Sequence, residues 1–203
     1  GGFVKIHGED PLPGEVPDPR AFSSKTRPVQ ALVLVAGIAM NLLLAWIIFT
    51  GLYLAPQRVS DHEIRAPLPL LSALVKGADL TTKVTLQTAE GLGQFLYGVV
   101  TFSADFSQVT GPVGIAGAVG NASTHGWGSL LTLVALISIN LAIINLIPIP
   151  ALDGGRLLFV IIEAIIRRPI QPSVAQTVNA VGFAFLLLLM VVVTASDVYK
   201  LFV

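Results

Sequence analysis

Cysteine is missing from the sequence and histidine is scarce. Without cysteine, disulfide bonds and thiolate metal sites are excluded, so a bound metal must be held by histidine, carboxylate or carbonyl groups. Only His7, His62 and His125 are available as imidazole ligands. Charge is also scarce, because Asp, Glu, Lys and Arg make up 12% of the chain, whereas soluble proteins average about 25%. No basic patch interleaved with aromatic residues is present, so the sequence predicts no nucleic-acid partner.

Apolar residues take the place of the missing charge, since 54% of the chain is hydrophobic. A helix of about 20 apolar residues crosses the roughly 30 Å hydrocarbon core of a bilayer. The composition therefore predicts a mainly α, polytopic membrane protein in contact with the lipid bilayer. Its expected spans are Val29 to Ala55, Trp127 to Ile147 and Val178 to Thr194. The sequence opens Gly-Gly-Phe rather than Met, which we interpret as a piece of a longer protein.

Changes in composition divide the chain into four parts. Residues 1–28 combine an alternating segment, expected to be a membrane-associated β segment, with a proline-rich loop that cannot be helical. Residues 29–55 form the first span. Residues 56–126 form an extracytoplasmic or interfacial segment, and residues 127–203 form a transmembrane core that ends with the last span.

The middle part contains one expected helix. Apolar residues recur at roughly helical spacing from Thr81 to Phe102, which predicts an amphipathic helix along the membrane surface. A glycine-punctuated stretch follows, with the sequence T-G-P-V-G-I-A-G-A-V-G. We expect it to form a tight, protein-packed turn rather than to continue the helix.

Lysine and arginine predict the orientation in the membrane. Three basic residues precede the first span and three follow the second, which places both groups on the same side; four others lie on the opposite side. By the positive-inside rule the first side is cytoplasmic, so Pro56 to His125 are expected outside the cytoplasm. The cytoplasmic set is Arg20, Lys25, Arg27, Arg156, Arg167 and Arg168.

One carboxylate, Asp153, follows a long uncharged span, since no Asp, Glu, Lys or Arg occurs from Gly126 to Leu152. An ionisable group at membrane depth costs at least a few kcal/mol and is a functional-site candidate. Asp153 before Gly-Gly and an apolar helical run is a good N-cap, and a hard carboxylate is also a suitable metal ligand. Pro148 and Pro150 break the preceding helix, which is tolerated at membrane depth where the loop is buried in protein or faces water.

Two asparagines, Asn140 and Asn145, lie near this break. Their side-chain amides are able to hold an extended peptide by its backbone. They are equally able to join neighbouring helices by hydrogen bonds. The sequence by itself leaves both interpretations open.

Around Asp153 the sequence reads N-L-I-P-I-P-A-L-D-G-G-R. It resembles the signature of the site-2 protease family of intramembrane zinc metalloproteases, in which the Asp of L-D-G-G is a zinc ligand. Three more segments resemble the family in the same order along the chain. G-G-F-V-K-I-H-G-E-D resembles its membrane-dipping β-hairpin segment, A-G-I-A-M-N-L-L-L-A its A-G-P-x-x-N helix, and T-G-P-V-G-I its S-G-P-V-G-I-type sequence. Bacterial regulators of envelope-stress signalling are the most similar members, which implies the bacterial inner membrane.

The resemblance implies a protease that binds Zn²⁺ and cleaves the transmembrane segments of membrane-anchored substrates. Asp153 is the implied catalytic residue and metal ligand, beside two histidines, while a glutamate acts as general base. The substrate helix must be unwound, and an edge strand near the N-terminus is able to pair with it by β-addition. The implied substrate-binding residues are Asn145, Asn140, Phe3, Val4 and Lys5.

Two features depart from the family. Its H-E-x-x-H helix, which supplies two histidine ligands and the glutamate base, is absent, because His62-Glu63-Ile64-Arg65-Ala66 lacks the second histidine and lies in the polar part. The sequence starts where that helix would end, so we expect the chain alone to be inactive. Residues 56–126 are also short, and poor in strand signals, for the peptide-binding PDZ domain of many members.

Two other functions fit the residues. A transporter or channel subunit would use a broken helix and a mid-membrane carboxylate to coordinate an ion. An inverted internal repeat would favour that class, and the sequence contains none. A catalytically dead relative of the proteases would bind membrane segments without cleaving them, and an H-E-x-x-H motif upstream of Gly1 would separate it from an active protease.

Overall fold

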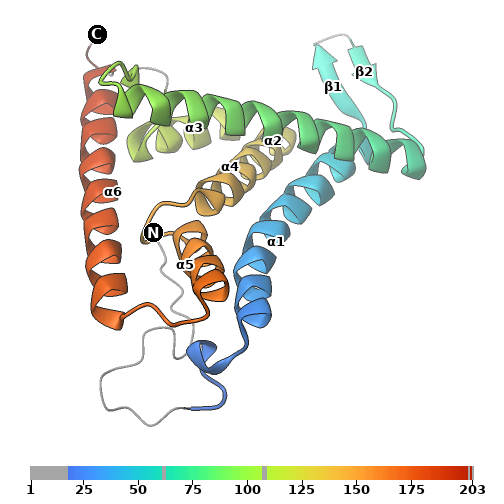
Figure 1. Ribbon diagram of the computed structural model, residues 1–203. Helices are drawn as coiled ribbons and strands as arrows, with labels where there is room; N and C mark the ends of the chain where they lie inside the picture. Colours follow the sequence, from blue (N-terminus) through green and yellow to red (C-terminus); the bar gives the residue numbers. More distant parts are fainter. Residues whose placement is uncertain (1–17, 61–62, 107–108, 201, 203) are drawn as a thin grey trace. The chain divides into compact units, whose positions relative to one another are not determined.

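A computed structural model describes residues 18–60, 63–106, 109–200 and 202. Within these ranges the chain forms six α-helices, a 3-10 turn (η1) and one pair of strands (Figure 1). The predicted mainly α class is confirmed. The elements are η1 Phe22–Ser24, α1 Arg27–Leu54, β1 Gln57–Ser60, β2 Glu63–Arg65, α2 Leu70–Val100, α3 Pro112–Thr124, α4 Trp127–Leu146, α5 Asp153–Ile166 and α6 Pro172–Lys200.

Three helices are long and apolar enough to cross a membrane: α1, α4 and the Ser173–Lys200 part of α6. Large apolar side chains such as Leu32 and Leu188 are exposed on them, as lipid-facing side chains are. The structure thus contains three candidate spans by length and composition, as the sequence predicts. The last helix is longer than predicted because polar residues continue it. Thr177, for example, donates its hydroxyl to the Ser173 carbonyl (2.9 Å).

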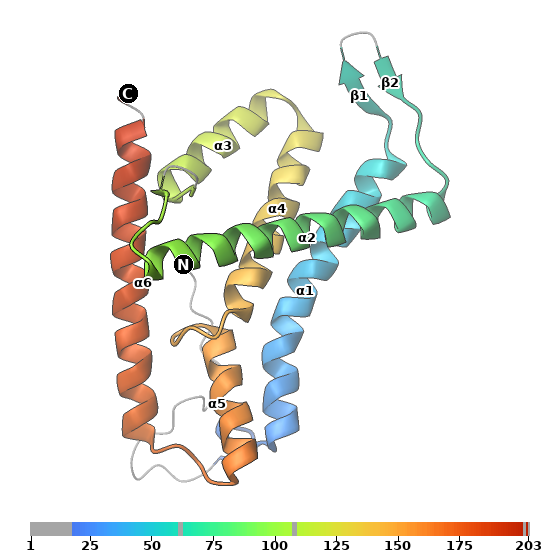
Figure 2. The same cartoon turned by 45° about the horizontal axis from the view of Figure 1, so that its top comes forward.

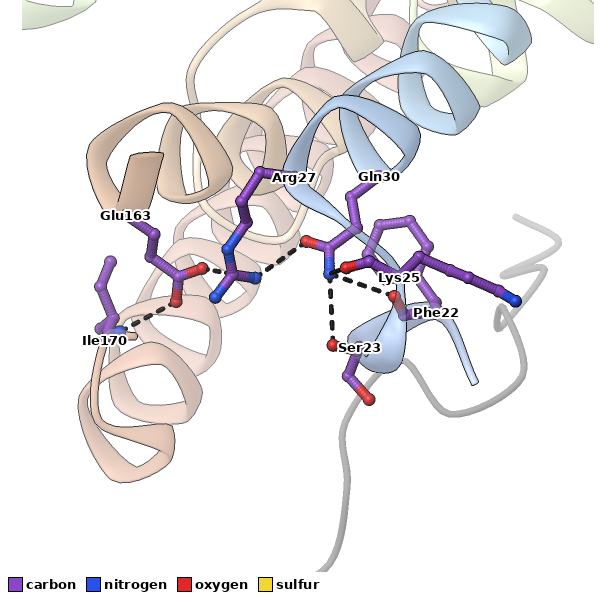
Figure 3. Close-up of polar contacts among 7 residues, drawn as sticks. All are labelled: Phe22, Ser23, Lys25, Arg27, Gln30, Glu163 and Ile170. Atoms are coloured by element: carbon purple, nitrogen blue, oxygen red, sulfur yellow. Dashed lines mark hydrogen bonds and ion pairs between the residues drawn. The ribbon is translucent and has the colours of Figure 1, made fainter. Parts of the chain in front are cut away.

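The chain divides into two compact units, and the first comprises residues 1–37 and 145–184. Its buried apolar core joins Phe22 of η1, Leu34 of α1 and Val160 of α5. Gln30 is only 2% exposed and donates its side-chain amide to three carbonyls of the η1 turn, those of Phe22, Ser23 and Lys25 (Figure 3). A buried amide therefore closes the turn that leads into α1.

An ion pair extends this polar cluster to α5. Arg27 donates to the side-chain oxygen of Gln30 (3.1 Å) and pairs with Glu163 (2.8 Å), as Figure 3 shows. The second oxygen of Glu163 accepts the N–H of Ile170 at 2.8 Å. The cluster thus fixes the end of α5 and the start of the connection to α6 within this unit.

The second unit comprises residues 38–144 and 185–203. Its core is formed by α1 and α4, and Ser138 of α4 donates to the backbone carbonyl of Asn41 in α1 (2.9 Å). The Trp46 indole N–H donates to the Leu74 carbonyl of α2 at 3.1 Å. The buried members of the core are Ala45, Phe49, Ala135, Ile139 and Ile143.

The helix predicted over residues 81–102 is α2, which begins earlier, at Leu70. Pro69 occupies the N-cap position, where a residue without an N–H breaks no helical hydrogen bond. Gly77 allows close contact with α1, because a Cβ atom there would lie 3.0 Å from the backbone nitrogen of Thr50. The first turns of α2 therefore pack on α1. The placement of α2 along the membrane surface remains a prediction.

The prediction of a tight turn at T-G-P-V-G-I-A-G-A-V-G is wrong, because α3 begins at Pro112. Proline is favoured at the first helical position, and Asp197 of α6 accepts the Gly114 N–H at 2.8 Å, which satisfies one of the unpaired donors of a helix start. The glycines allow the Asp197 side chain to approach the start of the helix closely, and they do not interrupt the helix. A Cβ atom at Gly111 or Gly114 would lie 2.8 or 3.1 Å from the Asp197 carboxylate.

The predicted β segment with Phe3, Val4 and Lys5 lies outside the described residues. In the described part of residues 1–28 the chain forms η1 and the beginning of α1, so no hairpin is found there. The strands that the structure does describe, β1 and β2, pair antiparallel between α1 and α2. In both views this pair extends beyond the C-terminal end of α1 (Figure 2).

Candidate functional site

Asp153 is the first residue of α5 and is half-buried. The N-cap position belongs to Leu152, which makes no side-chain cap bond, so the N-cap interpretation of Asp153 is wrong. A carboxylate in the first turn is favoured by the helix dipole. Among the described residues, no hydrogen bond or ion pair to this carboxylate is found. The geometry therefore leaves its oxygens available to a ligand.

Two buried glycines explain how α5 starts directly behind the proline break. A Cβ atom at Gly154 would lie 2.6 Å from the Leu146 carbonyl oxygen and would also meet that of Ile147. A Cβ atom at Gly155 would lie 2.9 Å from Pro150 Cα. Side chains are excluded at such distances, so Gly-Gly is required for the start of α5 to pack against the turn that follows α4. This packing fixes the backbone at Asp153.

The same turn contacts α6 within the first unit. Ala151 has a positive φ of 74° and donates its N–H to the side-chain oxygen of Asn179 at 3.3 Å. Gly182 is buried against Pro150, since a Cβ atom there would lie 2.6 Å from the proline Cβ. Sequence reasoning missed both α6 residues. The one signal for Asn179 was an amide side chain next to a long apolar run.

The two predicted asparagines occupy different environments. Asn145 is half-buried in the last turn of α4 and belongs to the same compact unit as Asp153. Asn140 is exposed and belongs to the second unit. Five residues apart on one helix, the two side chains point in directions about 140° apart. The structure thus brings Asn145 and Asp153 into one unit and does not place Asn140 with them. Phe3, Val4 and Lys5 lie outside the described residues.

One residue of this site, Asp153, is suited to bind a zinc ion. Carboxylate oxygen is a normal zinc ligand, and Asp153 has no competing partner among the described residues. No group of three His, Cys, Asp or Glu residues able to hold a metal is found in the described ranges. His125 is exposed in the second unit, where its ring contacts the Asn121 carbonyl at 2.8 Å. His7 and His62 lie outside the described residues.

Comparison with known proteins gives a consistent result. A profile of the peptidase family M50 matches residues 1–189. The zinc metalloprotease RasP of Oceanobacillus iheyensis is 46% identical over 118 residues, which cover 58% of this chain and 28% of that protein. The zinc metalloprotease RasP of Geobacillus kaustophilus is 43% identical over 133 residues. The regulator of sigma-W protease RasP of Bacillus subtilis is 44% identical over 133 residues. Each of these two matches covers 66% of this chain and 31% of the relative. The chain spans about a quarter to a third of the length of these relatives.

Proposed function

Because the chain belongs to peptidase family M50, the site-2 protease family, we propose that it forms part of an intramembrane zinc metalloprotease that cleaves transmembrane segments of membrane-anchored substrates. One observation carries the proposal. Asp153 is a half-buried carboxylate, fixed at the start of α5 and without a partner among the described residues. Zn²⁺ is the expected cofactor, since the relatives are zinc metalloproteases.

Asp153 is the metal ligand that we assign to this chain. When bound, zinc supplies a Lewis acid that polarises the scissile carbonyl and lowers the pKa of a water molecule. An H-E-x-x-H motif does not occur in residues 1–203. We assign the two histidine ligands and the glutamate base to another part of the full-length protein, and we expect this chain without them to be inactive.

Substrate binding is assigned to the polar groups on either side of the break. An extended peptide inside the membrane exposes amides that cost several kcal/mol each when unpaired. Asn145 belongs to the unit that contains Asp153, and we assign its amide to the substrate backbone. Asn140 is assigned a smaller role, mostly in packing. The backbone of Phe3, Val4 and Lys5 is assigned to pair with the substrate by β-addition.

The proposal includes an orientation, with Pro56 to His125 outside the cytoplasm. The chain has no cysteine, so single cysteines at Ser60 or Ser123 report topology directly. Both are expected to react with an impermeant maleimide added to the extracytoplasmic face of intact cells. Labelling only by maleimide added to the cytoplasmic face would show that the chain has the opposite orientation.

Asp153→Asn in the full-length protein tests the function itself. The substitution keeps the size of the side chain and removes the anionic ligand, so zinc content and cleavage of a membrane-anchored substrate should fall together, by about a hundredfold or more. Asp197→Asn, which changes a carboxylate that is already engaged in the structure, is the matched control and should keep zinc. Wild-type zinc content and cleavage in Asp153→Asn would refute the assignment. Zinc binding without cleavage in the unmodified protein would identify the catalytically dead relative.

A further inference from the structure

The turn before Asp153 is held in an unusual backbone conformation. Ala151 has a φ of 74°, in the left-handed region that is unfavourable for a residue with a Cβ atom. Its N–H donates to Asn179 Oδ1 at 3.3 Å. Asn179 therefore provides the polar contact that accompanies this conformation.

Two residues of α6 contact the turn. Asn179 and Gly182 are three residues apart, so they lie on the same face of the helix. Gly182 has no side chain, which allows Pro150 to approach so closely that a Cβ atom would lie 2.5 Å from its carbonyl oxygen. Asn179 holds the next residue, Ala151. We call these two positions the α6 seat.

The turn held by the α6 seat leads directly into α5. The Leu152 N–H donates to the Ile149 carbonyl (3.2 Å), and the Leu152 carbonyl accepts the Arg156 N–H (3.2 Å). A rotation of the backbone at Ala151 therefore moves the first residues of α5, of which Asp153 is one. The glycines of α5 restrict this region from the other side, through Ile147 and Ile149.

We propose that Asn179 is a positioning residue for Asp153, which stabilises the left-handed conformation of Ala151 and thereby fixes where the Asp153 carboxylate lies. The proposal rests on the proposed function, in which Asp153 is a zinc ligand. Asn179 acts through the turn and has no assigned contact with zinc or substrate. Groups that orient metal ligands typically contribute 10- to 100-fold to metal affinity.

The test measures zinc affinity of the full-length protein in detergent, by competition with a chelator. Asn179→Leu keeps the branched shape of the side chain, at larger volume, and has no acceptor oxygen, so it should weaken zinc binding about tenfold and speed hydrogen exchange at the Ala151 amide. Gln176→Leu is the matched control, because Gln176 is an exposed amide side chain on the same helix, and it should change neither value. A purely structural role of Asn179 would lower the melting temperature and leave zinc affinity unchanged.

Ala151→Gly supplies the decisive comparison, since glycine adopts positive φ without a steric penalty. In the Ala151→Gly background, Asn179→Leu should recover most of the lost zinc affinity. Wild-type affinity in Asn179→Leu, or an equal loss in the Ala151→Gly background, would overturn the proposal. If Asn179→Leu has no melting transition, Asn179→Ala gives the same comparison at smaller volume. If Asp153→Asn loses zinc and Asn179→Leu does not, only the positioning role fails; if Asp153→Asn keeps zinc, the proposed function fails.

Discussion

The turns that lead into α5 and α3 are built alike and use a carboxylate differently. Each carries glycines in close contact with neighbouring atoms, and each meets a polar side chain of α6 in its own unit. In the α3 turn the carboxylate is Asp197. It is 5% exposed, accepts the Gly114 N–H at 2.8 Å and lies 3.7 Å from the ammonium of Lys200. In the α5 turn the carboxylate is Asp153, which has no such contacts among the described residues.

Hydrogen-bond and ion-pair partners, rather than burial, distinguish the structural carboxylate from the candidate ligand in these two turns. Asp197 is the more buried of the two, yet its charge is offset by a donor and a cation of the chain itself. Lys200 also donates to the Val109 carbonyl at 3.1 Å, so the whole cluster fixes the segment before α3. Asp153 is half-buried and lacks an offsetting group among the described residues, which favours a cation from outside the chain.

The largest effect on stability is expected for Asp197→Ala. It leaves the Gly114 N–H and the Lys200 ammonium without their carboxylate, at a cost of about 2–4 kcal/mol in the free energy of unfolding. Thermal melting in detergent measures the loss, and zinc content should stay at the wild-type level. Asp197→Asn retains an acceptor and should lose less. A loss of zinc as large as that of Asp153→Asn would erase the distinction between the two carboxylates.

Gly155→Ala tests the close packing of the α5 turn. The new methyl group would meet backbone atoms of Ile149 and Pro150, which cannot move aside as a flexible side chain does. We expect a destabilisation of about 1–3 kcal/mol, together with weaker zinc binding. Gly117→Ala in α3 is the control, since nothing lies within 4 Å of a Cβ atom there and alanine favours a helix by up to about 1 kcal/mol. Equal melting temperatures for the two variants would contradict the close packing.

The smallest effect, a loss of cleavage activity, is expected for substitutions of Asn145 and Asn140. Asn145→Leu removes one amide that we assign to the substrate backbone, so cleavage should fall about tenfold with zinc still bound, as for one lost hydrogen bond. Asn140→Leu should have a smaller effect. Cleavage assays with a helical membrane substrate, alongside zinc analysis, measure both. Normal cleavage by Asn145→Leu would identify Asn145 as a residue that joins helices.

The candidate spans, and the choice of Asp153 as a candidate site residue, follow from the sequence alone because both depend on local composition. Uninterrupted apolar runs locate α1 and α4 to within a few residues, and a lone carboxylate after an uncharged run stands out without tertiary information. The start of α3 was missed because the glycines around Pro112 were interpreted as helix breakers. Their actual role depends on Asp197, which lies 83 residues from Gly114.

The support of the site was also beyond sequence reasoning. The contact between Ala151 and Asn179 joins positions 28 residues apart, and neither residue belongs to a pattern with a recognisable period. The positive φ of Ala151 has no sequence signal, because alanine rarely adopts it. Contacts of this kind arise from packing, which a single sequence does not specify.

The unequal lengths of the spans have a consequence for the lipid environment. With 28 residues, α1 is about 42 Å long, whereas the 20 residues of α4 give about 30 Å, close to the roughly 30 Å hydrocarbon thickness of a bilayer. A long helix adapts to a thinner or thicker membrane by changing its tilt. Since α4 has no spare length, hydrophobic mismatch at its C-terminal end falls on Leu146 and on the proline-broken turn that leads to Asp153.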